Sequence, residues 1–275
     1  MVDVIITNPV YDLYPEAPER NVLWYAEPYF EQIKKYLEEK KVPHEYLYKE
    51  DAVFTKVWDV MSKNSIIYIT GVGHGGHTYF TGYLVKLIFW CDGMYVWRHM
   101  MWNGYLPEWH YNTVFLILSC LTASVLGPWF RRYGAWSYLG WNHYFYFCAR
   151  IGKRKGKDWK ETPEMLWHKP VEEAFKKCIA AEITPKEAYD YIYRKFTEYL
   201  ESSEIPELFK VFLQWDRDHM VLIGHEDHPP KIRERRLKEK AKTYTIISSV
   251  IASTAGILLG YLTKKATVGR RVRVA

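Results

Sequence analysis

Cysteine is scarce in this chain, and no two cysteines stand in a Cys-x-x-Cys arrangement. The 275 residues contain four of them, Cys91, Cys120, Cys148 and Cys178, at wide spacing. Zinc ribbons need closely spaced pairs of thiolates, and small disulfide scaffolds need a denser set of cysteines. The sequence therefore indicates neither class of protein. It favours free thiols in a reducing compartment.

Glutamine and a secretory signal are also missing or nearly so. There are only two glutamines, Gln32 and Gln214, while Lys and Glu are abundant. That bias is typical of thermophile proteins from hot environments, although many mesophilic chains share it. The first residues, MVDVIITNPVYDL, contain neither a basic region nor a long apolar run. We therefore expect no secretory signal peptide.

The positive charge is concentrated at one end of the chain. The net charge is +6, and seven Lys or Arg lie between Lys231 and Lys242, with five more after Leu262. The remainder is close to neutral. Proteins that bind nucleic acid present a basic face on the folded domain, so this distribution predicts no nucleic-acid partner.

Two apolar, β-branched runs dominate the remainder of the sequence. They are SIIYIT at Ser65–Thr70 and VFLIL at Val114–Leu118, and each is followed by small residues. Such runs are typical of buried strands in a parallel sheet, which deliver loops to the carboxyl edge where ligands collect. One loop carries His74 and the other Cys120. The sequence therefore predicts a base and a nucleophile brought together by the fold.

Strands and helices alternate through most of the chain, which predicts an α/β fold with a mostly parallel central sheet covered on both faces. Besides the two runs above, we expect strands at Val2–Thr7, Tyr46–Tyr48, Ala135–Trp141 and Met220–Gly224. We expect helices at Val22–Lys41, Glu50–Lys63, Glu164–Ala180, Pro185–Glu201 and Leu208–Trp215, with Thr184 as the cap of the fourth.

The segment GVGHGG at Gly71–Gly76 has a second interpretation, because it fits G-x-G-x-x-G with Asp92 about 20 residues further on. A dinucleotide fingerprint belongs to the first strand of its unit and opens a helix, whereas this segment follows the third strand and precedes HTYFTGY, which begins with β-formers. We expect the glycines instead to make room for a substrate backbone beside His74. The alternatives that His74 only occupies a tight turn and that Cys120 is an inert buried cysteine stay open.

The order of these motifs resembles the caspase-like cysteine peptidases, which include gingipain, clostripain, legumain and separase. A strand running into His74-Gly75, a second running into Ser119-Cys120, and the later LGPWFRRYGAWSYLGW carry the resemblance, which covers most of Val2–His228. The segment GHED after Ile223 departs from the family pattern. The resemblance implies a three-layer α-β-α fold, with Cys120 as nucleophile and His74 as general acid and base. It also implies that the backbone N–H groups of Gly75 and Cys120 hold the oxyanion.

The resemblance also points to a specificity pocket beside the strand at Ala135–Trp141, which makes Trp141 and Asn142 candidate pocket residues and Asp92 a candidate acidic group. Aromatic residues crowd Phe89–Tyr111 and six basic residues lie in Arg150–Lys160. We interpret the first as an aromatic layer on the sheet, or alternatively a subsite wall. We interpret the second as an exposed loop, or alternatively a site of activating cleavage.

Histidine occurs in two short segments that raise the question of a metal. These are His74-x-x-His77 and the run His225 to His228. Neither has the sequence context of a known zinc motif, so we predict no metal site and no cofactor.

The chain changes character after His228. We divide it into a peptidase domain at 1–228, a basic juxtamembrane segment at 229–243, a C-terminal transmembrane helix at 244–263 and a basic tail at 264–275. Residues 244–262 carry no charge, and as a helix they would span about 28 Å. A peripheral or packed helix is the alternative. We expect a single-pass anchor with the catalytic domain in the cytoplasm.

The uncharged segment also carries small residues at intervals of four, namely Ser248, Ala252, Gly256 and Gly260. Such a stripe lets a second helix approach closely, so it predicts a homo-oligomer. Together these features predict a membrane-tethered cysteine endopeptidase that hydrolyses a peptide or protein substrate through a thioester. The alternative is a catalytically inactive caspase-like scaffold or recognition module anchored to a membrane.

Overall fold

The computed structural model describes residues 2–10, 23–90, 112–146 and 165–271. Its contacts divide the chain into two compact units, Met1–Pro229 and Pro230–Ala275. The first unit carries the sheet and both predicted catalytic residues. The second consists of one long helix and the C-terminal residues.

The centre of the first unit is a six-stranded sheet in the order β2-β1-β3-β7-β8-β9. Every neighbouring pair from β2 to β8 is parallel, and β9 runs antiparallel to β8. The predicted α/β fold with a mostly parallel sheet is confirmed, while the direction of β9 was not predicted. The strands are β1 (Val4–Asn8), β2 (His44–Tyr48), β3 (Tyr68–Val72), β7 (Val114–Leu118), β8 (Ser137–Trp141) and β9 (Met220–Gly224).

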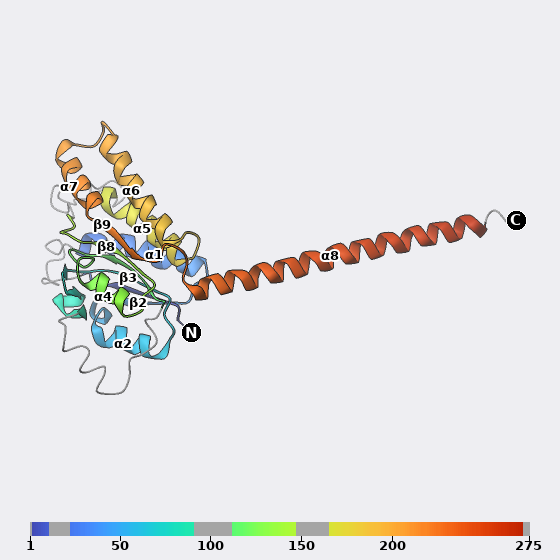
Figure 1. Ribbon diagram of the computed structural model, residues 1–275, viewed down its shortest axis with the longest axis horizontal. Coiled ribbons are helices and arrows are strands. Elements are labelled where there is room, and N and C mark those ends of the chain that lie inside the picture. Colours follow the sequence, from blue (N-terminus) through green and yellow to red (C-terminus); the bar gives the residue numbers. More distant parts are fainter. Residues whose placement is uncertain (1, 11–22, 91–111, 147–164, 272–275) are drawn as a thin grey trace. The chain divides into compact units, whose positions relative to one another are not determined.

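Helices cover both faces of this sheet, with α2 and α4 on one face and α1, α5 and α6 on the other (Figure 1). All residues of β1, β3, β7 and β8 are buried, which is why these strands have few polar side chains. The helices are α1 (Glu27–Glu39), α2 (Phe54–Lys63), α4 (Leu126–Arg132), α5 (Met165–Ile179), α6 (Pro185–Glu201) and α7 (Glu207–Asp218), with 3₁₀ turns η2 (Leu23–Ala26), η3 (Lys49–Asp51) and η4 (Tyr83–Val85).

The cap predicted for α6 is present. The backbone N–H of Glu187 donates to the Thr184 hydroxyl at 3.2 Å, and the Thr184 N–H donates to the Glu187 carboxylate at 2.7 Å. This reciprocal pair satisfies two N–H groups that the first helical turn leaves without partners. Pro185 has no backbone N–H, so it adds no further donor that needs a partner.

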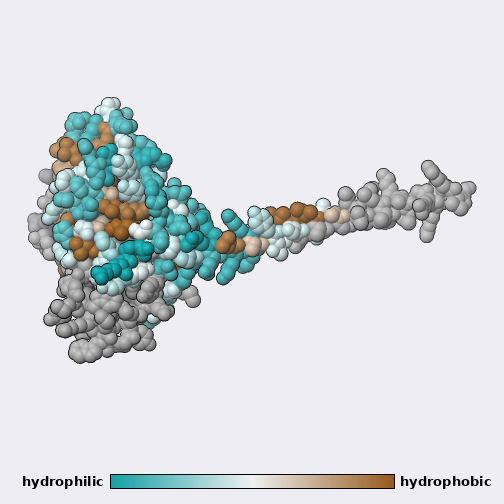
Figure 2. Space-filling model, in the orientation of Figure 1, coloured by the Kyte–Doolittle hydropathy of each residue, from teal (hydrophilic) through white to brown (hydrophobic). Residues whose placement is uncertain are grey.

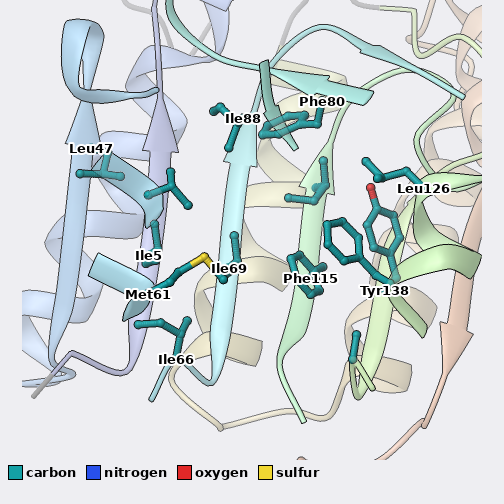
Figure 3. Packing of buried hydrophobic residues seen from close by; sticks show 14 of the residues in the cluster. Ile5, Leu47, Met61, Ile66, Ile69, Phe80, Ile88, Phe115, Leu126 and Tyr138 are labelled. Atoms are coloured by element: carbon teal, nitrogen blue, oxygen red, sulfur yellow. The ribbon is translucent and has the colours of Figure 1, made fainter. Parts of the chain in front are cut away.

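A second, three-stranded antiparallel sheet follows β3 and was not predicted as a sheet. It consists of β4 (Gly75–Gly76), β5 (Tyr79–Thr81) and β6 (Leu87–Trp90). Phe80 and Ile88 from this small sheet join the same buried cluster as Ile69 and Phe115 of the large sheet (Figure 3). Because strands rather than a helix follow GVGHGG, the helix N-terminus that a dinucleotide pyrophosphate needs is not in this place.

The second unit is the helix α8 (Pro230–Arg271), which joins the predicted basic segment and the predicted transmembrane segment into one element. Its apolar side chains Tyr244, Ile246, Ile247, Val250 and Ile251 are exposed, and Figure 2 shows a hydrophobic patch partway along it. Side chains from residue 256 onward lie outside the description. Among the residues that are described, no helix is long and apolar enough to cross a membrane, so the predicted transmembrane helix at 244–263 is unsupported.

Candidate active site

The two predicted catalytic residues follow neighbouring strands at the same edge of the sheet. The strands β3 and β7 are parallel neighbours, and their last residues, Val72 and Leu118, are partners in the register. His74 and Cys120 each follow two positions later. Both residues therefore start from the same carboxyl edge, on adjacent strands, as the sequence predicted.

The loops that carry them are packed directly against each other at Gly75. A Cβ added to Gly75 would lie 2.2 Å from the carbonyl oxygen of Cys120 and 2.3 Å from the Ser119 hydroxyl. The carbonyl oxygen of His74 is fixed from the other side by the backbone N–H of Thr81 at 2.9 Å and its hydroxyl at 3.2 Å. The backbone at His74 is thus held between the small sheet and the Cys120 loop.

The glycines around His74 serve this close packing. A Cβ at Gly71 would lie 1.9 Å from the Thr7 hydroxyl, and one at Gly73 would lie 1.9 Å from the Thr81 carbonyl oxygen. Side chains at these positions would collide with β1 and β5. At Gly71 and Gly73 the expectation that the glycines leave room for a substrate backbone is wrong, because the protein's own strands occupy that room.

His77 makes a second connection between the two loops. Its ring Nδ1 lies 2.7 Å from the Ser124 hydroxyl, which donates to the Leu121 carbonyl oxygen at 2.5 Å. Its own carbonyl oxygen accepts the N–H of Leu126 at 2.8 Å. Since the Ser124 proton is directed to Leu121, His77 acts as a structural tie to the turn after Cys120.

The segment after Cys120 is a turn, and residues 122–124 do not open a helix although they are small and polar or apolar residues of the kind that can begin one. Leu121 has a left-handed backbone with φ of 59°, and α4 begins only at Leu126. The N–H groups of Leu121 and Ala123 donate to the carbonyl oxygens of His143 and Trp141, both at 2.9 Å. These donors tie the turn to the end of β8, so no helix N-terminus is available to stabilise a Cys120 thiolate.

The Cys120 thiol is partly buried, and this burial raises its pKa above the usual value. The backbone of Phe145 lowers the pKa in part, the charge of Asp216 raises it, and the N–H of Cys120 itself lowers it. Burial has the largest effect. An ordinary thiol is only about 3% ionised at pH 7, and a raised pKa makes that fraction smaller. Cys120 therefore rests as a neutral thiol.

Residues 142–146, which we call the strap, run from the end of β8 across Cys120. The N–H of Phe145 lies 3.3 Å from the Cys120 Sγ, and the thiol donates to the Phe145 carbonyl oxygen at 3.7 Å. At the next residue, the N–H of Tyr146 donates to the carboxyl Oδ1 of Asp216 at 2.9 Å. The sulfur is therefore held by a segment that is itself held by α7.

The predicted pocket residues have different outcomes. Trp141 is 0% exposed, its Nε1 donates to the Asp216 carbonyl oxygen at 2.9 Å, and its ring packs edge-on against Phe145. A wholly enclosed ring cannot contact a substrate, so its prediction as a pocket residue is wrong. Asn142 is exposed at the start of the strap, and its N–H donates to the His219 carbonyl oxygen at 3.0 Å. Asp92 lies outside the described residues, as do most of Phe89–Tyr111 and all of Arg150–Lys160.

Two residues of the site, Phe145 and Asp216, were not predicted from the sequence. Phe145 acts through its backbone, so its residue type gives no signal. Asp216 does give one, because it shares the buried face of α7 with Phe209 and Leu213 at helical spacing. An acidic residue on an apolar face indicates a specific partner within the fold.

The remaining histidine-rich segment has structural contacts. The His225 ring stacks on Trp136 at 3.7 Å and lies 3.0 Å from the Arg131 guanidinium, and the Trp136 Nε1 donates to the Asp227 carbonyl oxygen at 2.7 Å. Across the described ranges, no group of three or more His, Cys, Asp or Glu side chains is arranged to hold a metal ion. Cys178 is enclosed in α5, and Cys91 and Cys148 lie outside the described ranges.

No model of a protein family matches the chain, and no curated protein is significantly similar to it.

Proposed function

We propose that residues 1–229 form a cysteine peptidase of caspase-like fold, with Cys120 as nucleophile and His74 as general acid and base. The observation that supports it best is the placement of both residues at one sheet edge. They follow register partners of adjacent parallel strands, and the backbone beyond His74 packs on the carbonyl group of Cys120. Chemistry in open α/β sheets collects at this edge.

Acylation would begin with the neutral thiol. His74 takes the S–H proton as the sulfur bonds to the scissile carbonyl carbon, and the carbonyl oxygen becomes an oxyanion. By resemblance, the N–H groups of Gly75 and Cys120 hold this oxyanion, at about 3 kcal/mol for each donor. The C–N bond then breaks, the His74 imidazolium gives its proton to the leaving amine, and a thioester to Cys120 remains.

Deacylation reverses these roles. His74 takes a proton from water, whose oxygen bonds to the thioester carbon. The C–S bond breaks, and the imidazolium returns its proton to the sulfur as the carboxylic acid leaves. One histidine is sufficient for both halves of the reaction, and every proton that it accepts is returned.

A second candidate is a catalytically inactive caspase-like module that serves as a scaffold. The observation that favours it is the state of Cys120, whose thiol is protonated, partly buried and bonded to both backbone groups of Phe145. In the peptidase, the strap must yield to the substrate for the sulfur to reach a carbonyl carbon. In the scaffold it would stay in place.

The purified full-length chain distinguishes the two candidates. It is incubated with a mixture of fluorogenic peptides and with a peptide-based thiol-reactive inhibitor, and intact mass locates any adduct. For a peptidase we expect hydrolysis and one adduct on Cys120, with hydrolysis lost in Cys120→Ala and kept in Cys91→Ala. Equal hydrolysis by wild type and Cys120→Ala would contradict the proposal. A folded wild type that gives neither hydrolysis nor adduct would favour the scaffold.

We also propose that α8 attaches the protein to a membrane through residues 244–262. Supporting this are the absence of charge in that stretch and the seven basic residues in Lys231–Lys242 before it, which anionic headgroups attract. Washing membranes with alkaline carbonate tests the proposal. An integral anchor stays in the pellet, and complete recovery in the soluble fraction would exclude it.

A further inference from the structure

We propose that Asp216 is a positioning residue that holds the strap, residues 142–146, over the Cys120 thiol. This deepens the proposed peptidase site and rests on it only in taking Cys120 as the group whose reactivity matters. The strap then acts as a cover, and Asp216 is the side chain that fixes it.

The Asp216 side chain lies in the interior of the fold. Asp216 is 0% exposed and lies on the buried face of α7. One carboxyl oxygen accepts the Tyr146 N–H at 2.9 Å, and the other makes no hydrogen bond within the described part of the chain. Burial raises the pKa of this carboxyl, and the Tyr146 N–H and then the Trp167 indole lower it in part, although the Trp167 Nε1 makes no hydrogen bond among the described residues. A buried carboxyl is costly unless its contacts are specific, so this residue type needs an explanation beyond packing.

Asp216 and the Cys120 sulfur are connected through two consecutive residues of the strap. Asp216 holds the N–H of Tyr146, and the preceding residue, Phe145, bonds the sulfur through both its N–H and its carbonyl oxygen. Because a peptide unit is planar and stiff, fixing the N–H of Tyr146 also orients the carbonyl group of Phe145. Losing the Asp216 acceptor therefore releases the atoms that cover the thiol.

The strap has further contacts, with the same end of α7 and with the turn after Cys120, where the Leu121 N–H donates to the His143 carbonyl oxygen at 2.9 Å, and none of them uses the Asp216 side chain. The Trp215 Nε1 donates to the Tyr144 carbonyl oxygen at 3.0 Å, and the Asn142 N–H donates to the His219 carbonyl oxygen at 3.0 Å. These contacts survive substitution of Asp216. They keep the strap near its site while its centre opens, so the change is local.

The side-chain chemistry provides a conservative variant. Burial raises the pKa of Asp216 well above that of a free carboxyl, which favours the neutral acid. Asn presents the same acceptor oxygen without charge, whereas Leu has a similar shape and no acceptor. Asp216→Asn should therefore keep the strap in place, and Asp216→Leu should release it.

Alkylation of Cys120 in the full-length protein tests the proposal. Iodoacetamide is added at pH 7.5, and peptide mass spectrometry follows the modification of Cys120 with time. Uncovering the thiol lowers its pKa, and a fall of about one pKa unit gives a rate about tenfold higher. We expect that increase in Asp216→Leu, a rate within about twofold of wild type in Asp216→Asn, and no change in Asp218→Ala, whose carboxylate lies at the surface beside Arg217.

The buried Cys178 reports whether each variant is folded, because it stays unmodified in the native protein. A folded Asp216→Leu that reacts at the wild-type rate, or an Asp216→Asn that reacts as fast as Asp216→Leu, would overturn the proposal. If Asp216→Leu modifies Cys178 and is therefore unfolded, amide exchange in wild type decides instead. Slow exchange at Phe145 and Tyr146 supports the proposal, and exchange at the rate of an open loop overturns it.

These readouts need no peptide cleavage. If the wild type hydrolyses no peptide but the variants show the expected alkylation pattern, the proposed peptidase activity is contradicted and the role of Asp216 in holding the strap is supported. If the protein hydrolyses peptides but substitution of Asp216 does not change the alkylation rate of Cys120, the peptidase is supported and the role of Asp216 is contradicted.

Discussion

The backbone of Gly75 lies so close to Cys120 that an added Cβ would be 2.2 Å from the Cys120 carbonyl oxygen. That contact is to backbone, which cannot rotate away. Gly75→Ala must therefore push the His74 loop and the Cys120 loop apart. A displacement of about 1 Å in a catalytic pair typically costs about 10²-fold in rate, so we expect that loss in kcat/KM with the fold retained. Peptide hydrolysis and far-UV circular dichroism measure the two effects.

Gly76→Ala is the matched control. A Cβ there would meet the ring of Tyr79 at 2.4 Å, and that side chain is 40% exposed and can turn aside. We expect at least half of wild-type activity in Gly76→Ala. Equal losses in the two variants would mean that the contact with Cys120 is not what sets the activity.

His74 and His77 should differ sharply. Removing a general acid and base costs about 10² to 10⁴-fold, so His74→Ala should lose that much in kcat/KM. His77→Ala loses one hydrogen bond to Ser124 but keeps the backbone bond from Leu126. We expect less than about a tenfold loss there, since one hydrogen bond is worth about 1 kcal/mol. A larger loss in His77→Ala than in His74→Ala would mean that His77, and not His74, is the general base.

Alkylation of the Cys120 thiol should require a higher pH than alkylation of a free cysteine. Its pKa is raised, chiefly by burial, and only the thiolate attacks an alkylating agent. As pH rises from 6 to 10, we expect the alkylation rate of Cys120 to keep rising past the point where a free cysteine in a short peptide levels off. An inflection below that of the peptide would mean that a neighbouring positive group stabilises the thiolate, against the present geometry.

The elements that the sequence predicted best are those whose pattern is set by burial. Bounds were predicted to the residue for β7, Val114–Leu118, and for α6, Pro185–Glu201. The first is an unbroken apolar run buried on both faces, and the second has an amphipathic period and a local capping pair. In both cases the signal lies within the element itself.

The elements that were missed depend on contacts from elsewhere in the chain. The strands β4, β5 and β6 have two, three and four residues, too short to show a period. The turn after Cys120 contains small polar residues that favour a helix start, but bonds to the carbonyl oxygens of Trp141 and His143 hold it in another form. The sequence therefore predicted that His74 and Cys120 follow two strands of one mostly parallel sheet, while the strap over the sulfur required the structure.

The small residues Ser248, Ala252, Gly256 and Gly260 of α8 recur every four positions, which in a helix places them on one stripe. If two copies pack along this stripe, Gly256→Leu and Gly260→Leu should separate the helices and abolish crosslinked dimers in detergent, because a large side chain prevents close backbone approach. Ile257→Leu, which alters a neighbouring position without adding bulk, should crosslink as wild type does. Undiminished dimers in both glycine variants would show that the stripe is not an interface.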